Sequence, residues 1–353
     1  MRLHRIQVEN FRRLKKLEVD LLGPDGNPRP FTVVVGPNMS GKTTLLDAVH
    51  LAYEAIANAR KPGWRPGLDP ADPTLRPDPN RPIKVSIDFS LHDGEYEAMR
   101  ALEKALGSSL DVAPAAVYSF TFRWPPPAAS PHGVIASEPP EAQLAFRGRA
   151  LASMALKRKL VTEKCLDDVG GVFYLDQNRQ GRLSEGRYKT DMRSALHERA
   201  VPRDVLGWFV RAAIFDQKWD PETQGESQWS RVKRLFAELA APAAIDDMKP
   251  SDEGYDLRLL RDGGSYYSAG ASSGERQILR LVANIVYVRA VRSVVLIDEV
   301  ELNLHPRWQR SLLRFCQTGG DDDNQFIVTT HSDALLRYVD ASAVVVLDAL
   351  DQA

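Results

Sequence analysis

Residues 36 to 43 read Gly36-Pro37-Asn38-Met39-Ser40-Gly41-Lys42-Thr43, which is the pattern G-x-x-x-x-G-K-[ST] of a phosphate-binding loop. A β-prone run, Phe31–Val35, precedes the loop, and a helix-competent run from Thr44 to His50 follows it. This context fits the motif, because loop N–H groups and the positive end of a helix dipole bind phosphate together. The segment therefore predicts a strand, a glycine loop and a helix built around a phosphate group.

The same loop predicts which nucleotide chemistry to expect. Lys42 is expected to reach the β- and γ-phosphates of a nucleoside triphosphate, and Thr43 to hold Mg²⁺. The predicted nucleotide-binding residues of the loop are Gly36, Pro37, Asn38, Met39, Ser40, Gly41, Lys42, Thr43 and Thr44. We therefore expect ATP and Mg²⁺ as cofactors.

Composition and charge exclude several classes of protein. The 353 residues are 43% hydrophobic and 26% charged, which are ordinary globular values. A net charge of −1 gives no overall basic field for nucleic acid, although a local basic patch stays possible. Cys165 and Cys316 form neither a metal-ligand spacing nor a disulfide framework. The N-terminus has no signal-peptide core and no apolar stretch is long enough to span a membrane, so we expect a cytoplasmic protein without a membrane partner.

The first half of the chain predicts strands interrupted by proline-rich loops. Alternating apolar residues predict strands at 2–9 and 14–20, and the helix after the phosphate-binding loop is expected to end near Arg60. Residues 61–82 contain seven prolines, which predicts an extended loop. Further along we expect strands at 83–91, 117–124 and 171–175, helices at about 94–106 and 141–168, and a second proline-rich loop at 125–140.

The second half predicts helices, a hairpin and then alternating elements. Residues 190–245 carry apolar positions at helical spacing. Asp262-Gly263-Gly264 predicts a hairpin turn. After the hairpin we expect helices at 275–291, 306–317 and 332–338, and strands at 293–297, 325–330 and 343–347. This alternation predicts a parallel sheet covered by helices, and the absence of heptads argues against a long coiled-coil arm.

A buried-type strand, Val294–Ile297, ends in the two acids Asp298 and Glu299. In nucleotide hydrolysis two such acids do different work. Asp298 is predicted to hold Mg²⁺, directly or through water, and Glu299 to orient or deprotonate the attacking water. The alternative, in which the acids only cap the next element, is disfavoured by the phosphate-binding loop earlier in the chain.

A serine-rich segment, Ala271-Ser272-Ser273-Gly274-Glu275, precedes a long predicted helix. It forms a capping-box pattern, and serine hydroxyls beside free N–H groups at a helix start also bind anions. The segment resembles the signature of ABC-type ATPases, usually Leu-Ser-Gly-Gly-Gln. Its departures at Ala271 and Ser273 are those of the SMC, RecF and OLD branch. The resemblance makes Ser272, Ser273, Gly274 and Glu275 nucleotide-binding residues that act on ATP held by another subunit.

Two further runs carry this resemblance. Thr329-Thr330-His331-Ser332 follows an apolar strand, and the resemblance makes His331 the switch histidine at the γ-phosphate. The run from Val300 to Pro306 resembles the D-E-P-E-x-x-L-H-P run of stand-alone OLD-like AAA ATPases, with Val300 in place of a proline. Glu301 and Asn303 would then lie in the loop that crosses to a partner subunit.

Two assignments leave alternatives open. Gln177 follows a strand in mid-chain and is a candidate Mg²⁺ and water contact, with Gln180 or a plain polar loop as the alternatives. At the N-terminus, Asn10-Phe11-Arg12 resembles the N-F-R segment of SMC and RecF-type heads. Arg12 or Arg13 could approach the nucleotide, or the basic run could be a solvated face.

The expected fold is α/β: a P-loop NTPase of the ABC-type head class with a mixed or parallel sheet, a β-subdomain and a helical lobe. Residues 1–60 and 170–350 are expected to form the head, with the phosphate-binding loop in one lobe and the signature and acid pair in the other. Residues 61–169 are expected to hold proline-rich loops, the β-subdomain and a helical insertion. Residues 190–245 are expected to form a helical subdomain.

The resemblance implies an ATPase that works as an ATP-sandwiched homodimer or a higher oligomer. Lys42, Glu299 and His331 are the expected catalytic residues, and Thr43, Asp298 and Gln177 the expected metal contacts. We expect an ATP-gated switch in DNA repair or anti-phage defence with a separate effector, such as a nuclease. The alternatives are a RecF-like ATP-dependent DNA clamp, a non-hydrolysing nucleotide-sensing scaffold and a transporter ATPase subunit.

Overall fold

The structure is a computed structural model that describes residues 1–58, 74–109, 112–125, 134–138, 142–176, 204–251 and 254–348. The chain forms two compact units. Unit 1 comprises Met1–Tyr174, Ala290–Glu299 and Cys316–Ala353, and unit 2 comprises Leu175–Arg289 and Val300–Phe315. No helix in the described ranges is long and apolar enough to span a membrane.

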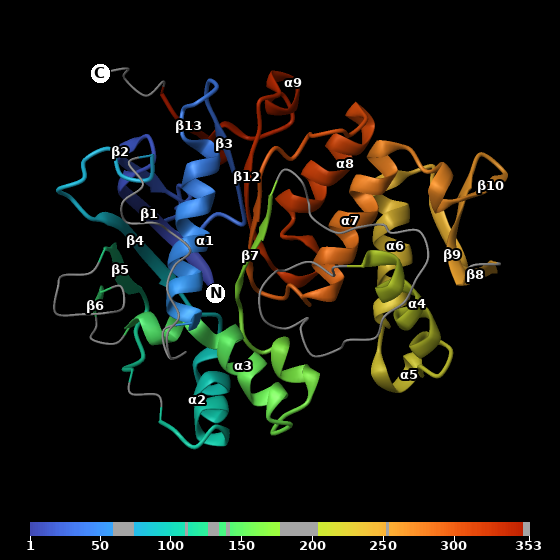
Figure 1. Cartoon of the computed structure of the whole chain (residues 1–353), viewed down its shortest axis with the longest axis horizontal. Coiled ribbons are helices and arrows are strands. Elements are labelled where there is room, and N and C mark those ends of the chain that lie inside the picture. Colours follow the sequence, from blue (N-terminus) through green and yellow to red (C-terminus); the bar gives the residue numbers. More distant parts are fainter. Residues whose placement is uncertain are drawn as a thin grey trace. The chain divides into compact units, whose positions relative to one another are not determined.

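A parallel sheet forms the centre of unit 1 (Figure 1). Its strands, in spatial order, are β13 (Val344–Val346), β3 (Phe31–Val35), β12 (Gln325–Thr329), β11 (Val294–Ile297) and β7 (Val172–Leu175). β13, β3, β12 and β11 run parallel. Every residue of β3, β11 and β12 is buried, as expected for parallel strands covered on both faces. The carboxyl ends of these strands therefore meet at one edge, where ligands bind in open α/β sheets.

An antiparallel sheet forms a second layer of unit 1. In spatial order its strands are β2 (Leu14–Asp20), β1 (Arg2–Phe11), β4 (Ile83–Ser90), β5 (Tyr118–Trp124) and β6 (Val134–Glu138). β4 alternates between buried and half-buried residues along its whole length, so only one face of this sheet joins the core.

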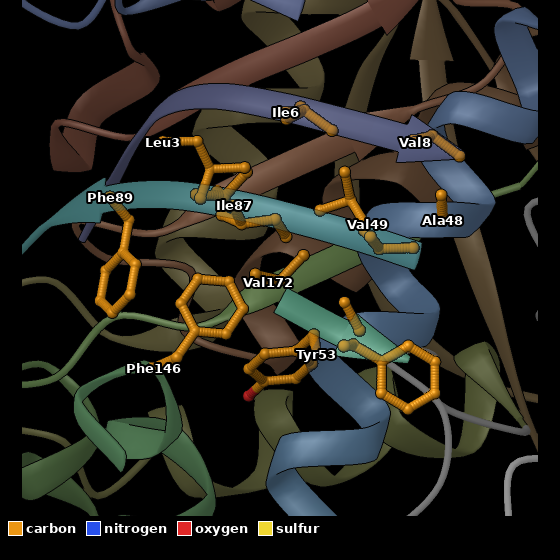
Figure 2. Packing of buried hydrophobic residues seen from close by; sticks show 14 of the residues in the cluster. Leu3, Ile6, Val8, Ala48, Val49, Tyr53, Ile87, Phe89, Phe146 and Val172 are labelled. Atoms are coloured by element: carbon orange, nitrogen blue, oxygen red, sulfur yellow. The ribbon is translucent and has the colours of Figure 1, made fainter. Parts of the chain in front are cut away.

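Helix α1 (Lys42–Asn58) supplies the apolar centre of unit 1 (Figure 2). Its Ala48, Val49 and Tyr53 lie in one cluster with side chains of the antiparallel sheet and of the parallel sheet. The ring of Phe146 packs edge-on against that of Phe89 of β4, with 4.8 Å between the ring centroids. Burying a side chain of this size contributes about 1.5–3 kcal/mol. Because α1 follows the phosphate-binding loop directly, core packing also fixes the direction of that loop.

A second apolar cluster of unit 1 joins the remaining helices. It includes Met99 and Leu102 of α2, Leu151 of α3 and Leu166. The helical elements around it are α2 (Glu95–Ala105), η1 (Ala142–Arg147), α3 (Gly148–Lys157) and η2 (Glu163–Leu166). The C-terminal part of unit 1 adds η4 (Gly320–Asp322), α9 (Asp333–Leu336) and η5 (Ala341–Ala343).

Unit 2 combines helices with a three-stranded antiparallel sheet. The elements are α4 (Val205–Asp216), α5 (Pro221–Gln224), α6 (Gln228–Ala240), β8 (Ala244–Ser251), β9 (Gly254–Arg261), β10 (Gly264–Tyr267), η3 (Ser268–Gly270), α7 (Ser273–Tyr287) and α8 (Pro306–Gln317), whose last two residues belong to unit 1. α6 packs against α7, and α4 packs against both. The sheet order is β10-β9-β8.

The α/β class predicted from the sequence is confirmed, and three local predictions are wrong. The helix expected at about 141–168 is divided into η1, α3 and η2, with turns after Lys157. Residues 134–138 form the strand β6 and are not part of a loop, because Val134 to Glu138 pair with β5. The prolines of the segment 125–140, which was predicted to be a loop, lie outside this edge strand. The hairpin at β9 and β10 has a third strand, β8, which begins at Ala244 inside the segment predicted to be helical. The polar residues of β8 and Pro250 interrupt the alternation of apolar residues from which a strand is predicted.

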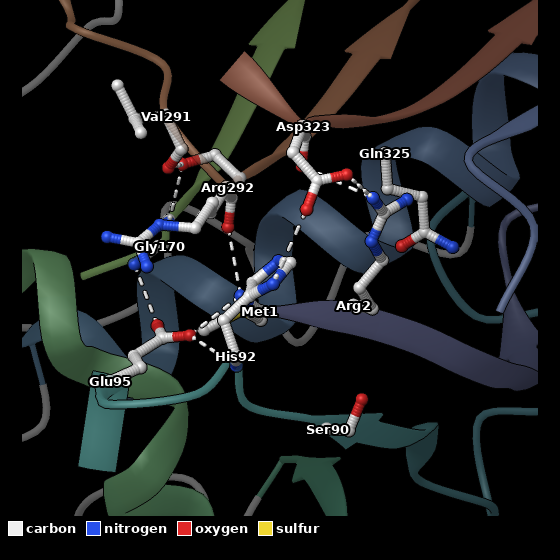
Figure 3. Close-up of polar contacts among 12 residues, drawn as sticks. Met1, Arg2, Ser90, His92, Glu95, Gly170, Val291, Arg292, Asp323 and Gln325 are labelled. Carbon is white, nitrogen blue, oxygen red and sulfur yellow. Dashed lines mark hydrogen bonds and ion pairs between the residues drawn. The ribbon is translucent and has the colours of Figure 1, made fainter. Parts of the chain in front are cut away.

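A buried ion pair joins distant segments of unit 1 (Figure 3). The Met1 ammonium donates to Glu95 Oε2 at 2.7 Å and to the Arg292 carbonyl at 2.9 Å. Glu95 also accepts from the N–H groups of Gly170 at 2.7 Å and His92 at 3.0 Å. Burial lowers the pKa of the Met1 amine, and Glu95 opposes that shift. The pair of Met1 and Glu95 thus connects β1 and α2 with the segments before β7 and β11.

His92, beside this pair, makes the stability depend on pH. Burial, assisted by the Met1 charge, lowers the pKa of His92 from 6.5 to about 4. Between these values the unfolded chain binds more protons than the folded chain, so the free energy of unfolding falls as the pH drops through this window. Replacing His92 by Gln removes this dependence.

We expect wild-type protein to lose about 1–2 kcal/mol relative to His92→Gln between pH 6.5 and 4, a value reduced for partial contact with water. Urea unfolding at several pH values measures both proteins. Above about pH 7.5, where the histidine is neutral in both the folded and the unfolded chain, the difference between them should be constant, which serves as an internal control. A difference that stays constant down to pH 4 would contradict the buried, neutral histidine.

Candidate nucleotide-binding site

The phosphate-binding loop in unit 1 joins β3 to α1, as predicted. Gly41 has φ +96°. A Cβ at Gly41 would lie 2.5 Å from Leu14 Cδ2. Only glycine fits here, because backbone angle and space both exclude a side chain. α1 has no acidic residue in its first turn, so the positive end of its dipole is not neutralised by its own side chains.

Side chains inside the loop fit a triphosphate. Lys42 is buried, and its Nζ donates to the carbonyls of Gly36 at 2.8 Å and Pro37 at 2.9 Å. An ammonium held over the loop can exchange these carbonyls for charged phosphate oxygens, which are stronger acceptors. The Ser40 hydroxyl is also buried and has no hydrogen-bond partner among the described residues. A bound anion would provide one.

Asp298 connects the loop to the end of the parallel sheet. Thr43 Oγ1 lies 3.0 Å from Asp298 Oδ2, and Thr329 Oγ1 donates to Asp298 Oδ1 at 2.6 Å. In the described part of the chain, no cluster of three or more His, Cys, Asp or Glu side chains could hold a metal ion. Mg²⁺ commonly takes one or two protein oxygens together with substrate phosphates and water. Thr43 and Asp298 supply such oxygens.

Glu299 and His331 lie at the same edge of the sheet. Glu299 Oε1 is 3.8 Å from His331 Nε2. Glu299 has φ +48°, a left-handed conformation that is uncommon for glutamate. Its N–H donates to Thr329 Oγ1 at 2.8 Å. The structure therefore brings Lys42, Thr43, Asp298, Glu299 and His331 together in unit 1.

The arginines of the first hairpin lie against this loop and its helix. Arg12 pairs with Asp47 of α1 and lies 5.3 Å from the centre of the Phe11 ring. Arg13 donates to Met39 Sδ at 2.7 Å. Burial raises the pKa of Asp47, and Arg12 opposes the shift. Both arginines are thus near the phosphate-binding loop, and their contact with nucleotide stays a prediction.

The serine-rich segment lies in unit 2 and caps α7 as its pattern predicts. The Ser272 N–H donates to Glu275 Oε2 at 2.7 Å, and the Glu275 N–H donates to Ser272 Oγ at 3.3 Å. Tyr266 Oη of β10 donates to Glu275 Oε1 at 2.5 Å. Burial opposes ionisation of the Glu275 carboxyl, but the hydrogen bonds that it accepts from Tyr266 and Ser272 outweigh burial and lower its pKa. Ser272 and Ser273 remain exposed, so their hydroxyls are accessible from outside the chain.

Glycine is required in the capping segment for packing. A Cβ at Gly274 would lie 2.8 Å from the Trp308 ring and 3.0 Å from the Asn303 carbonyl. Asn303 has φ +57°, in the loop between β11 and α8. Within unit 2 the serine-rich segment therefore packs against the loop that contains Asn303. The resemblance assigns this loop to a contact with a partner subunit.

The structure does not describe two of the predicted positions, and it shows one residue at the site that the sequence did not predict. Gln177 and Gln180 lie outside the described residues, so both remain alternatives. Thr329 contacts both acids, yet the sequence alone assigned it no role. Its signal was its place at the end of an apolar strand, directly before Thr330 and His331.

Two family models match parts of this chain. The family model described as "AAA ATPase domain" matches residues 1–64. The model described as "AAA domain, putative AbiEii toxin, Type IV TA system" matches residues 176–337. The crystal structure of an SmcHead bound to the C-winged helix domain of ScpA is similar in fold, with a TM-score of 0.52 and 16% identity over 96% of this chain and 93% of that one. The two AAA family matches and the fold of an SMC head agree with the resemblance of the sequence motifs to ABC-type ATPases.

Two curated relatives of this chain are retron proteins. The "Retron Vc95 probable ATPase" of Vibrio cholerae serotype O1 biovar El Tor is 28% identical over 119 residues, 30% of this chain and 23% of the relative. The "Retron Ec83 probable ATPase" of Escherichia coli is 35% identical over 101 residues, 25% of this chain and 18% of the relative. The matches thus span less than a quarter of each relative's length.

Replacing Gly41 by Ala should weaken ATP binding by about tenfold or more, because it strains the backbone and pushes the loop away from Leu14. Gly26→Ala is the matched control, since Gly26 has φ +75° and no atom within 4 Å of its Cβ position. Titration with a fluorescent ATP analogue measures both variants. Equal affinity of Gly41→Ala and Gly26→Ala would contradict the proposed phosphate cradle.

Proposed function

We propose that this chain is a Mg²⁺-dependent ATPase whose ATP-bound form closes a dimer and acts as a switch. The main support is the joint position of Thr43, Asp298, Glu299 and His331 around the phosphate-binding loop. A site for nucleotide binding alone would need the loop and the metal ligands. An acid and a histidine 3.8 Å apart add groups suited to activating water.

Each side chain has a distinct role in this proposal. Lys42 neutralises β- and γ-phosphate oxygens, and Thr43 and Asp298 would hold Mg²⁺, which neutralises charge that develops on the phosphates. Glu299 orients the attacking water and accepts its proton. His331 donates to the γ-phosphate and limits the orientations of Glu299. These roles also make ATP and Mg²⁺ the proposed cofactors.

A second subunit is proposed to complete the site. Ser272 and Ser273 are exposed at the start of α7, where the positive end of the helix dipole favours an anion and where the Ser272 hydroxyl would exchange its contact with Glu275 for a phosphate oxygen. In this proposal they cap the γ-phosphate bound by another copy of the chain. ATP then joins two subunits, and hydrolysis releases them.

The biological role is proposed from the relatives. Two retron ATPases among them support a defence-related function, with a separate effector protein such as a nuclease as the partner. DNA repair and a RecF-like DNA clamp remain alternatives, and a cytoplasmic location is part of the same proposal. Measuring ATP hydrolysis with and without duplex DNA separates the clamp from a DNA-independent switch.

Glu299→Gln should lower kcat by about a hundredfold or more while preserving ATP binding, because the amide cannot accept the proton of water. ATP should therefore hold this variant as a dimer, detectable by light scattering after size-exclusion chromatography. Glu97→Gln makes the same chemical change on an exposed side chain of α2 and should behave as wild type. Wild-type turnover by Glu299→Gln would contradict the assigned role.

A mixing experiment tests the contribution of the second subunit. Lys42→Ala and Ser272→Arg should each be inactive alone. In an equal mixture, half of the dimers pair the two variants and carry one intact composite site, which predicts about a quarter of wild-type activity. If the mixture is no more active than the two variants measured separately, Ser272 does not act in trans.

A further inference from the structure

Thr329, the last residue of β12, contacts both acids that follow β11. Its hydroxyl donates to Asp298 Oδ1 at 2.6 Å and accepts from the Glu299 N–H at 2.8 Å. Thr329 is only 1% exposed, so water does not compete for these bonds. A hydroxyl has one proton and must direct it at one acceptor. Because the Thr329 hydroxyl donates to Asp298, its lone pairs face the Glu299 N–H, and each hydrogen bond favours the other.

Strand register explains why this residue meets both acids. β11 and β12 are parallel, and their last backbone partners are Ile297 and Val328. The next step along both strands brings Asp298 beside Thr329, where backbone pairing ends. The threonine side chain there takes over the connection between the two strands.

The contact with Glu299 stabilises an unusual backbone conformation. A left-handed glutamate costs about 1 kcal/mol or more, and persists only where its surroundings hold it. Here the surroundings include the Thr329 hydroxyl on the Glu299 N–H. This backbone conformation sets the direction in which the Glu299 side chain leaves the strand, and its carboxylate ends 3.8 Å from His331.

We propose that Thr329 is a positioning residue for ATP hydrolysis, which fixes the side chain of Asp298 and the backbone of Glu299 through one hydroxyl. The proposal rests on the proposed function. Thr329 acts through the two acids and needs no contact with the nucleotide. It should therefore affect the rate of the chemical step more than nucleotide binding, which Lys42 and the loop N–H groups dominate.

Thr329→Val is the central variant, because valine keeps the shape and the strand propensity of threonine and removes both hydrogen bonds. The Glu299 N–H then loses its buried acceptor, and Asp298 loses a donor. We expect kcat to fall by about tenfold or more and KM to change by less than about threefold. Thr329→Ser keeps the hydroxyl and should restore kcat to within about threefold of wild type.

Thr32→Val provides a matched control. Thr32 lies on the neighbouring strand β3, is fully buried, and pairs in register with Ile327 of β12. Its hydroxyl has no hydrogen-bond partner among the described residues. The same chemical change there should leave kcat within about twofold of wild type, because no bond is lost.

Steady-state ATP hydrolysis of the full chain, with thermal unfolding as a check of folding, decides between the outcomes. Wild-type kcat in folded Thr329→Val would overturn the inference, and so would a Thr329→Ser variant as slow as Thr329→Val. An inactive wild-type protein would instead overturn the proposed function, and the inference with it. If Thr329→Val does not fold, Thr329→Ala removes the same hydroxyl with less bulk and is judged by the same criteria.

Discussion

The Asp298 carboxylate is the interaction on which the candidate site depends. It lies at the end of β11 and contacts hydroxyls from α1 through Thr43 and from β12 through Thr329. Two other segments of the chain are thereby fixed within hydrogen-bond distance of this carboxylate. Parallel strand order makes this possible, because the carboxyl ends of adjacent parallel strands reach the same edge.

The apolar core of unit 1 holds the helix that follows the phosphate-binding loop. α1 is buried between the antiparallel sheet and the parallel sheet, and its first residue is Lys42. Movement of the phosphate-binding loop would therefore disturb core packing as well as the contact of Gly41 with Leu14. A rigid loop has its N–H groups already in place for phosphate, so less ordering is needed when nucleotide binds.

Sequence patterns predicted most of the site because its chemistry demands particular residues at strand ends. The loop glycines and the pairs Lys42–Thr43 and Asp298–Glu299 have few substitutes, and alternating strands and helices predicted that they share one edge. The role of Thr329 had no such pattern, since threonine is common in strands and its partners depend on register. β8 was missed for a related reason: its pairing with β9 outweighs the low strand propensity of Pro250 and its acidic residues.

Magnesium-dependent ATP binding by wild type and Asp298→Asn tests the central role of this carboxylate most directly. Asparagine keeps the shape of the side chain and removes the charge that would hold Mg²⁺. Isothermal titration calorimetry with ATP, in Mg²⁺ or in EDTA, gives the dependence for each protein. We predict that Mg²⁺ strengthens ATP binding to wild type by about tenfold or more, and has little effect on binding to Asp298→Asn. The same gain from Mg²⁺ in both proteins would contradict the account.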